Sequence, residues 1–406
     1  MFARLREFSP TVWLVILATM FGRFTFFMVW PYLAVFLQRE HGLSPSQIGF
    51  FLGGPTLIGI LAGFYVGYLS DLFGRRRILL LSALTSSAAL IVMGVTANLW
   101  VILAAMTVQG IARSGVEAPG KALMTDVLVN REAKDLALHV RYYALNIGAA
   151  FGPLLGGYLG LTGQQDTFVL VGLVYVLYFV AGYVVLYLVD PPVPTLAREP
   201  ARFSFAEVLR TLKADQAFLV FILALLVGNI TYSQLEAGMV LFLGTGGEAY
   251  VLRAYALVVL VNAVTVLVFQ FPLLALLRGI EPFRRSMIGV GLMMVAFLML
   301  AVTSATAVGW ILAAVFILSL GEVILFPTLQ VLIDRLAPPD MKGSYFGASS
   351  LGGFGFVLGP VVGGGLLEHA GGAGLWSGMA FLALGAAVLY RGAELLRAAP
   401  AGLTGN

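Results

Sequence analysis

Seven ionisable side chains interrupt stretches of the sequence that are otherwise apolar, and these are the residues that could do chemistry. The acids are Glu117, Glu236 and Glu322, and the bases are Arg23, Arg113, Lys121 and Arg141. A charge at the centre of a bilayer costs at least about 2.5–3.5 kcal/mol, so such residues usually face a cavity or a partner. The chemistry they predict is charge recognition and proton transfer.

The spacing of these residues separates two kinds of site. Arg113, Glu117 and Lys121 are four residues apart, so they share one face of a helix, either as a static salt bridge or as the wall of a charged cavity. Glu236 and Glu322 have no base within one turn of their own helices. A desolvated carboxyl without a charged partner holds its proton near neutral pH, as a proton carrier must. The alternative for each is a protonated acid that is hydrogen-bonded between helices.

Composition indicates a polytopic membrane protein. The 406 residues are 60% hydrophobic and 11% charged, with a mean hydropathy of +0.96. There are no cysteines, and the three histidines fall at predicted helix ends or loops, so we expect no thiol chemistry, metal or cofactor. The net charge of +4 is scattered over short loops, which argues against a nucleic-acid partner.

Twelve apolar windows of about 20 residues each predict an all-α protein with twelve transmembrane helices. Their ranges are 11–38, 46–70, 77–96, 99–127, 136–162, 166–189, 217–244, 250–277, 284–304, 308–335, 342–367 and 373–393. Eighteen of the 24 Lys and Arg residues fall in loops on the side of the membrane where the N-terminus lies, and only Arg39 and Arg253 fall in loops on the other side. This bias predicts a cytoplasmic (inner) membrane protein with both termini in the cytoplasm.

The chain is predicted to divide into two bundles of six helices, residues 1–189 and residues 217–406. The segment 190–216 between them begins with Asp190-Pro191-Pro192 and contains Ser204-Phe-Ala-Glu207, a capping-box pattern. We therefore expect a cytoplasmic linker that carries a short amphipathic helix.

A repeated motif shows that the two halves are similar. Gly148-xxx-Gly152-Pro153-xx-Gly156-Gly157 recurs 207 residues later as Gly355-xxx-Gly359-Pro360-xx-Gly363-Gly364. Both copies lie within predicted spans. Tandem halves of this kind are typical of secondary transporters, in which two repeats rock around a central site.

The loop between the second and third spans reads Gly67-Tyr-Leu-Ser-Asp71-Leu-Phe-Gly74-Arg75-Arg76-Arg77. It resembles the signature loop of the major facilitator superfamily, except that Leu72 stands where an arginine usually follows the aspartate. The resemblance implies the twelve-helix fold of that family, and a conformational lock in which this loop engages an acid at the end of the fourth helix. The corresponding residues here are Gly67, Asp71, Gly74, Arg75, Arg76 and Asp126.

Further resemblances point to one branch of that family. The motif from Gly148 to Gly157 resembles the family's antiporter motif, which is associated with exporters. Gln234-Leu-Glu236, Leu320-Gly321-Glu322 and Gly343-Ser344-Tyr345 are similar to stretches of bacterial multidrug/proton antiporters. Met106 stands where many of those proteins carry an arginine. The resemblance implies a monomeric transporter that exchanges protons for lipophilic or cationic drugs by alternating access.

Aromatic residues near the level of the charges are candidates for the wall of a substrate cavity, with ordinary core or lipid packing as the alternative. They are Phe26, Phe27, Trp30, Tyr142 and Tyr232.

Two other functions remain open from the sequence. Arg23-Phe24 and Tyr142-xxx-Asn146-Ile-Gly148 resemble parts of the peptide/proton symporters, which suggests a proton-coupled importer of peptides or other small polar solutes. Thr19, Gly22 and Ala118 stand where those symporters have two acids and a lysine. A sensor or membrane enzyme is the other alternative, but neither a soluble output domain nor a nucleophile–base pair supports it.

Overall fold

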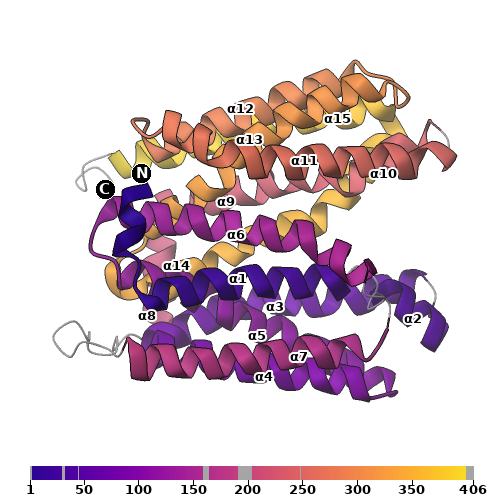
Figure 1. Ribbon diagram of the computed structural model, residues 1–406. Coiled ribbons are helices and arrows are strands. Elements are labelled where there is room, and N and C mark those ends of the chain that lie inside the picture. Colours follow the sequence, from indigo (N-terminus) through magenta and orange to yellow (C-terminus); the bar gives the residue numbers. More distant parts are fainter. Residues whose placement is uncertain are drawn as a thin grey trace. The chain divides into compact units, whose positions relative to one another are not determined.

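The computed structural model describes residues 2–29, 33–43, 45–158, 164–190, 204–246 and 248–398, and all regular structure among them is helical (Figure 1). The six crossings of the first half are α1 (Pro10–Val29), α3 (Pro45–Phe73), α4 (Arg75–Val95), α5 (Leu99–Asp126), α6 (Arg131–Tyr158) and α7 (Thr167–Tyr183), which a π-helical turn continues to Val189. A short helix, α2 (Leu33–His41), follows α1, and residues 30–32 between them lie outside the described part of the chain.

The second half repeats this plan. Its first four crossings are α9 (Gln216–Tyr232) with α10 (Ala237–Gly244), α11 (Glu248–Leu276), α12 (Pro282–Ala301) and α13 (Val308–Leu336). The last two lie in one stretch that begins with α14 (Lys342–Ala348) and continues into α15 (Phe354–Ala398). Gly371, with φ 66°, bends α15 and divides it into the eleventh and twelfth crossings. The prediction of twelve transmembrane helices is confirmed.

The chain forms two compact units. The first contains Met1–Val208 and also the segment Ile333–Ser350, and the second contains Leu209–Leu332 and Leu351–Asn406. In the first unit α1 packs against α6, and α4 packs against α5 and α7. In the second unit α15 packs against α9 and α12. The end of α13 and all of α14 thus pack with the first half of the sequence, which the sequence did not indicate.

The linker helix α8 (Phe205–Ala214) begins with the expected capping box. The Glu207 amide donates to Ser204 Oγ at 3.2 Å, and the Ser204 amide donates to Glu207 Oε2 at 2.7 Å. Phe205 packs against the rings of Phe64 and Tyr68 on α3, with centroid distances of 5.2 Å. The start of the linker helix is therefore anchored on the helix that carries the signature loop.

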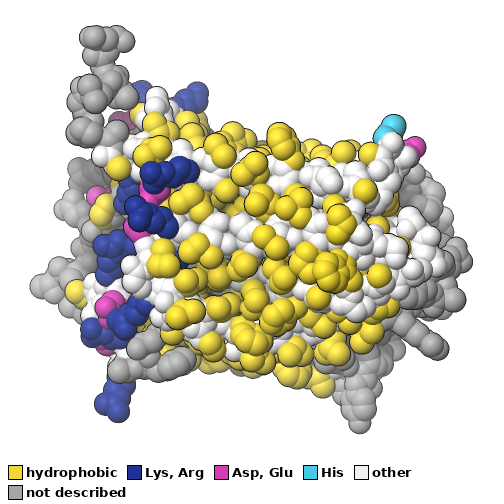
Figure 2. Space-filling view, turned by 90° about the horizontal axis from the view of Figure 1, so that it is seen from above, with side chains coloured by type: hydrophobic (Ala, Val, Ile, Leu, Met, Phe, Trp, Pro, Cys, Tyr) yellow, Lys and Arg dark blue, Asp and Glu magenta, His cyan; other side chains and the backbone are white. Residues whose placement is uncertain are grey.

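Long apolar side chains cover the helix surfaces, as lipid contact requires. On the face shown in Figure 2, hydrophobic side chains extend along the helices, while Lys and Arg side chains gather at one end of them. Exposed residues of the second unit include Leu260, Val268, Leu298, Phe381 and Val388. Because lipid tails are as apolar as these side chains, the exposure carries no penalty in a bilayer.

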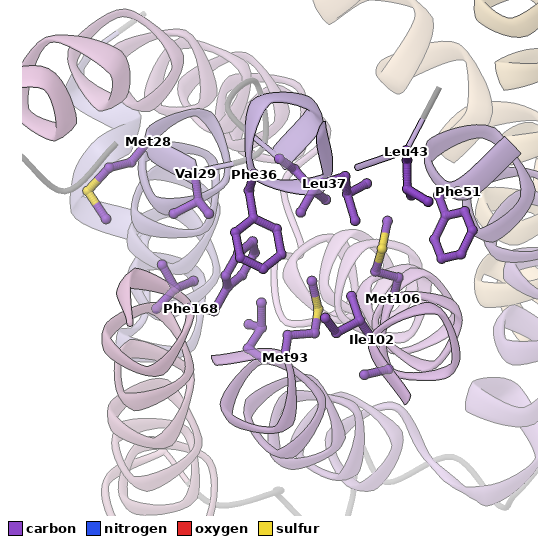
Figure 3. Close-up of a cluster of buried hydrophobic side chains, with 14 residues drawn as sticks. Met28, Val29, Phe36, Leu37, Leu43, Phe51, Met93, Ile102, Met106 and Phe168 are labelled. Atoms are coloured by element: carbon purple, nitrogen blue, oxygen red, sulfur yellow. The ribbon is translucent and has the colours of Figure 1, made fainter. Parts of the chain in front are cut away.

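An apolar cluster closes the first unit at the end remote from the signature loop. Phe36 and Leu37 of α2 point toward Met93, Ile102 and Met106 of α4 and α5 (Figure 3). Phe168 of α7 lies next to Phe36, with ring centroids 6.5 Å apart. The side chains of this cluster are apolar, and beside them Gln165 Nε2 donates to the Met93 carbonyl at 2.9 Å. The opposite end of the same unit carries the charged residues of the signature loop.

Candidate functional site

Asp71, at the end of α3, accepts hydrogen bonds from the segment that opens α14. Its Oδ1 accepts from the Gly343 amide at 3.0 Å, and its Oδ2 accepts from the Ser344 amide and from Ser344 Oγ, both at 2.7 Å. Gly74, with φ 93°, makes the turn between α3 and α4 that lets Arg75 fold back toward Asp71.

Arg75 links the acids on each side of it. Its Nη2 lies 3.3 Å from Asp71 Oδ1, its Nη1 forms an ion pair with Asp126, and it also donates to the Ala122 carbonyl at 3.0 Å. The structure therefore brings together Asp71, Arg75 and Asp126. Ser344, which donates two hydrogen bonds to Asp71, was not predicted as its partner, although the stretch Gly343-Ser344-Tyr345 was noted for its resemblance to bacterial antiporters.

Glycines allow this close approach of α3 and α14. A Cβ on Gly67 would lie 3.0 Å from the carbonyl carbon of Gly343 and from the Cα of Gly347, and a Cβ on Gly347 would lie 2.6 Å from the Gly63 carbonyl oxygen. No side chain fits at such distances, so the backbones of the two helices are in direct contact.

Arg76 does not take part in these contacts, which corrects its assignment to the lock. Its Nη1 donates to the carbonyls of Leu186 and Asp190, at the far end of the sixth crossing. There Asp190 Oδ2 accepts from the Thr11 amide at 3.3 Å. Partial burial raises the pKa of Asp190, but hydrogen bonds from Thr11 and Ser9 outweigh it and leave the pKa below its usual value. Arg76 thus ties together the helix ends of the first unit.

Two further ion pairs at this end were not predicted. Arg335 pairs with Asp135 of α6, and Lys342 pairs with Asp334 and lies 3.3 Å from Thr125 Oγ1. Lys342 is buried although it carries a charge. The sequence does contain a run of charged residues from Asp334 to Lys342. Its basic residues were interpreted only as loop residues that set the orientation in the membrane.

Inside the first unit, the predicted intramembrane charges form one cluster, but with different partners than expected. Glu117 Oε2 lies 2.5 Å from Arg141 Nη2 and 3.7 Å from Lys121 Nζ. Arg113, one turn away from Glu117 on α5, instead places its guanidinium carbon 4.3 Å from the centre of the Phe26 ring. A salt bridge was one of the two alternatives for Arg113, Glu117 and Lys121, and Glu117 does approach Lys121 on its own helix. Arg113 lies over Phe26 instead, and α6 contributes Arg141 to the carboxylate.

The aromatic candidates divide between several places. Phe26 and Phe27 meet edge to face at 5.4 Å, and Arg23 lies 6.0 Å from both ring centres. Tyr142 is half-buried on α6. Tyr232 belongs to the second unit and packs against Phe326 at 4.6 Å. Trp30 lies outside the described residues.

In the second unit, Glu322 is buried in the middle of α13 and is 1% exposed. Its Oε2 accepts a hydrogen bond of 2.6 Å from Asn262 Nδ2 of α11, which also lies 3.0 Å from Ser319 Oγ. Asn262 was not among the predicted residues, because a single amide in an apolar span carries no pattern. The carboxyl of Glu322 is thus desolvated and accepts a hydrogen bond from α11.

Glu236 is in a different environment from the one predicted. It follows the 3-10 turn Ser233–Leu235 that breaks the seventh crossing between α9 and α10, and its side chain is exposed rather than buried. Ser233 and Gln234 are buried at this break, and Gln234 Nε2 donates to the Gly359 carbonyl at 2.8 Å. The helix break turns Glu236 away from the packed interior.

The two copies of the repeated glycine motif occupy equivalent places in their units. A Cβ on Gly152 would lie 2.5 Å from the Phe24 carbonyl oxygen of α1. A Cβ on Gly359 would lie 2.9 Å from Ser233 Cβ, at the end of α9. A Cβ on Gly148 would likewise collide with the backbone of α1, and a Cβ on Gly363 would collide with the Gln234 side chain. Gly156 is buried. Pro153 and Gly157 lie in α6, but their surroundings are outside the part of the chain that the structure describes.

Comparison with known proteins agrees with this architecture. Residues 15–354 match the family model described as Major Facilitator Superfamily. A relative from Bacillus subtilis (strain 168), the uncharacterized MFS-type transporter YqjV, is 30% identical over 88% of this chain and 87% of its own length.

Two further relatives carry names that describe an activity. The Na(+), Li(+), K(+)/H(+) antiporter of Planococcus maritimus is 22% identical over 86% of this chain and 87% of its own. The multidrug resistance protein MdtH of Cronobacter sakazakii (strain ATCC BAA-894) is 28% identical over 85% of this chain and 83% of its own.

A solved structure has the same fold. The human organic anion transporter MFSD10 (TETRAN) superimposes with a TM-score of 0.76 at 19% identity, over 94% of this chain and 99% of that one. Among the described residues, ten helical stretches are long and apolar enough to cross a membrane, and the family model matches most of the chain. This chain is therefore a multi-pass membrane protein and belongs to the major facilitator superfamily of transporters.

Proposed function

We propose that the protein is a proton-coupled antiporter that exports lipophilic or cationic compounds by alternating access. The observation that carries this proposal is Glu322, a carboxyl 1% exposed within a membrane crossing, which accepts a hydrogen bond from the Asn262 amide. Because burying a charged carboxylate in a membrane costs several kcal/mol, an acid at this depth is suited to take up and release a proton during transport.

In the proposed cycle Glu322 takes a proton from the outer side. A substrate that enters from the cytoplasm then favours the charged carboxylate, and the proton leaves toward the cytoplasm; this exchange is the coupling. Glu236 is exposed at the break in the seventh crossing, and we expect it to contact a cationic substrate. The contacts of Asp71 with Gly343 and Ser344 close the cytoplasmic side in one of the two states and must break in the other.

Two relatives support this assignment. One is named a multidrug resistance protein, and another a cation/proton antiporter. The repeated glycine motif, associated in this family with exporters, is intact in both halves and in close contact with α1 and α9.

A proton-coupled importer of peptides or other small polar solutes is the second candidate. The observation that favours it is the pairing of Glu117 with Arg141 and Lys121 beside Arg23, a charged cluster that would suit a polar solute. The direction in which a pH gradient drives the substrate distinguishes the two candidates.

Proton release on binding tests the proposed role of Glu322. Purified protein in weakly buffered solution with a pH indicator should release protons when ethidium, a lipophilic cation, is added. Glu322→Gln should reduce this release by more than half, whereas Glu368→Gln, at an exposed acid on α15, should leave it unchanged. Equal release from the wild type and Glu322→Gln would remove Glu322 from the coupling mechanism.

A further inference from the structure

The charge cluster of the first unit contains more positive than negative charge. Four basic side chains, Arg23 of α1, Arg113 and Lys121 of α5, and Arg141 of α6, lie within reach of one another's charges. Among the described side chains Glu117 is the one carboxylate of this group. The cluster therefore carries a formal charge of about +3 inside a membrane protein, where unbalanced charge is costly.

Glu117 neutralises only one side of the cluster. Its Oε2 is occupied by Arg141 Nη2 at 2.5 Å and approached by Lys121 Nζ at 3.7 Å. No carboxylate among the described side chains lies within 4 Å of the guanidinium groups of Arg23 or Arg113. The Nε atoms of Arg23 and Arg141 are buried, and no atom of the described residues accepts a hydrogen bond from either of them. The Arg141 side chain as a whole is also buried, at 5% exposed. Buried donors of this kind are normally satisfied.

An apolar surface lies beside the unpaired guanidinium groups. The Arg113 guanidinium lies over the face of Phe26 at 4.3 Å, and Arg23 lies 6.0 Å from both Phe26 and Phe27. The aromatic faces hold the two guanidinium groups in place through cation–π attraction. They also offer an apolar body a surface to pack against within a few ångströms of the positive charges.

From this arrangement we propose that the cluster is a binding site for the acidic group of a lipophilic organic anion, such as a carboxylate or sulfonate on an aromatic body. The oxygens of such a group match the planar donors of a guanidinium and would satisfy the unpaired N–H groups. The negative charge of the bound group would offset the excess positive charge of the cluster. Phe26 and Phe27 would take the aromatic body.

The inference narrows the substrate class of the proposed function, and only the statement that the anion is transported rests on that function. A substrate with an acidic group, alone or as part of a zwitterion, is attracted to Arg23 and Arg113, while a purely cationic one is repelled by them. Binding of the anion itself requires neither a proton gradient nor transport, so it can be tested separately.

Isothermal titration of the purified protein in nanodiscs tests the site with three probes that share a naphthalene body. Naphthalenesulfonate should bind at least about tenfold more tightly than the neutral naphthalenesulfonamide, since one charge-assisted hydrogen bond is worth roughly that factor. Naphthylmethylammonium should bind more weakly still. Equal affinity for the three probes would overturn the proposal, and this comparison needs no variant.

Variants then locate the site. Arg113→Gln and Arg23→Gln should each weaken naphthalenesulfonate binding by about tenfold and leave the sulfonamide unaffected. Arg210→Gln, at an exposed position on the linker helix, removes the same charge elsewhere and should change neither affinity. An unchanged sulfonate affinity in folded Arg113→Gln and Arg23→Gln protein would rule out this cluster. If the sulfonate binds as expected but no pH gradient moves it, the site stands and the proposed antiport fails.

Discussion

Asp71 is the residue at which the contacts between α3 and the opening of α14 meet. Its two oxygens accept from Gly343 and from Ser344, and one of them also faces Arg75. An amide in its place would keep one acceptor and point an NH₂ group at donors. A hydrogen bond to a charged group contributes about 1.5–3 kcal/mol. Losing one such bond should therefore shift the equilibrium between the two transport conformations by more than tenfold.

Asp71→Asn should therefore reduce transport at least tenfold while the protein is still made at a normal level. The absence of cysteines in the native chain allows spin labels at Phe73→Cys and Asp340→Cys, both exposed, to report the separation of α3 from the start of α14. The distance distribution should broaden toward longer values in Asp71→Asn. Glu132→Gln, at an exposed acid on α6, should behave as the wild type. An unaltered distribution in Asp71→Asn would remove the locking role.

Asn262 predicts a second effect at the scale of single residues. Its Nδ2 donates to the buried carboxyl of Glu322 at 2.6 Å. In Asn262→Ala the carboxyl loses that donor, so gradient-driven substrate exchange should slow by about tenfold for a lost bond of roughly 1.4 kcal/mol. Exchange at the wild-type rate in folded Asn262→Ala protein would show that this hydrogen bond does not contribute to coupling.

At the scale of whole elements, the glycine faces decide how closely helices approach. Gly359 lies against Ser233 and the Ile230 carbonyl, whereas Gly385, on the same helix, has open space where its Cβ would be. Gly359→Leu should therefore lower thermal stability by several degrees and reduce transport, while Gly385→Leu should change both little. Gly152→Leu, against Phe24 of α1, should behave like Gly359→Leu. Thermal unfolding and transport assays that rank the three variants equally would contradict a packing role for the repeated motif.

The elements themselves could be predicted because a membrane crossing is a local property of the sequence. About 20 apolar residues are enough to span a bilayer, so composition alone located the twelve crossings. The turn at Gly74 and the capping box at Ser204 could also be predicted, since each depends on neighbours a few residues away. The helix break before Glu236 could not be predicted, because it depends on the hydrogen bond from Gln234 to Gly359, 125 residues later.

The partners within the site depend on packing between helices, which the sequence does not display. Glu117 approaches Lys121 of its own helix, as one of the two alternatives predicted, but its shorter contact is with Arg141 of α6. Asp71 finds its partner Ser344 273 residues away. For the same reason the ionisable residues could be listed from the sequence, but their pairing could not.

At the scale of the whole molecule, the distribution of Lys and Arg predicts that both termini and the linker helix face the cytoplasm. Single cysteines at Lys213 on α8 and at Thr306, between α12 and α13, lie at exposed positions on opposite sides of the predicted membrane. In intact cells a membrane-impermeant maleimide should label Thr306→Cys and leave Lys213→Cys unlabelled until the cells are opened. Labelling of Lys213→Cys but not of Thr306→Cys in intact cells would show the opposite orientation in the membrane, and the proposed direction of transport would then be reversed.

Gradient-driven transport in proteoliposomes tests the central claim most directly. The probes are permanently charged, ethidium and naphthalenesulfonate, so a pH gradient cannot redistribute them passively. An antiporter should accumulate at least one of them when the lumen is acidic, and the accumulation should vanish in Glu322→Gln. Accumulation only when the outside is acidic, or a wild-type level in Glu322→Gln, would contradict proton antiport through this carboxyl.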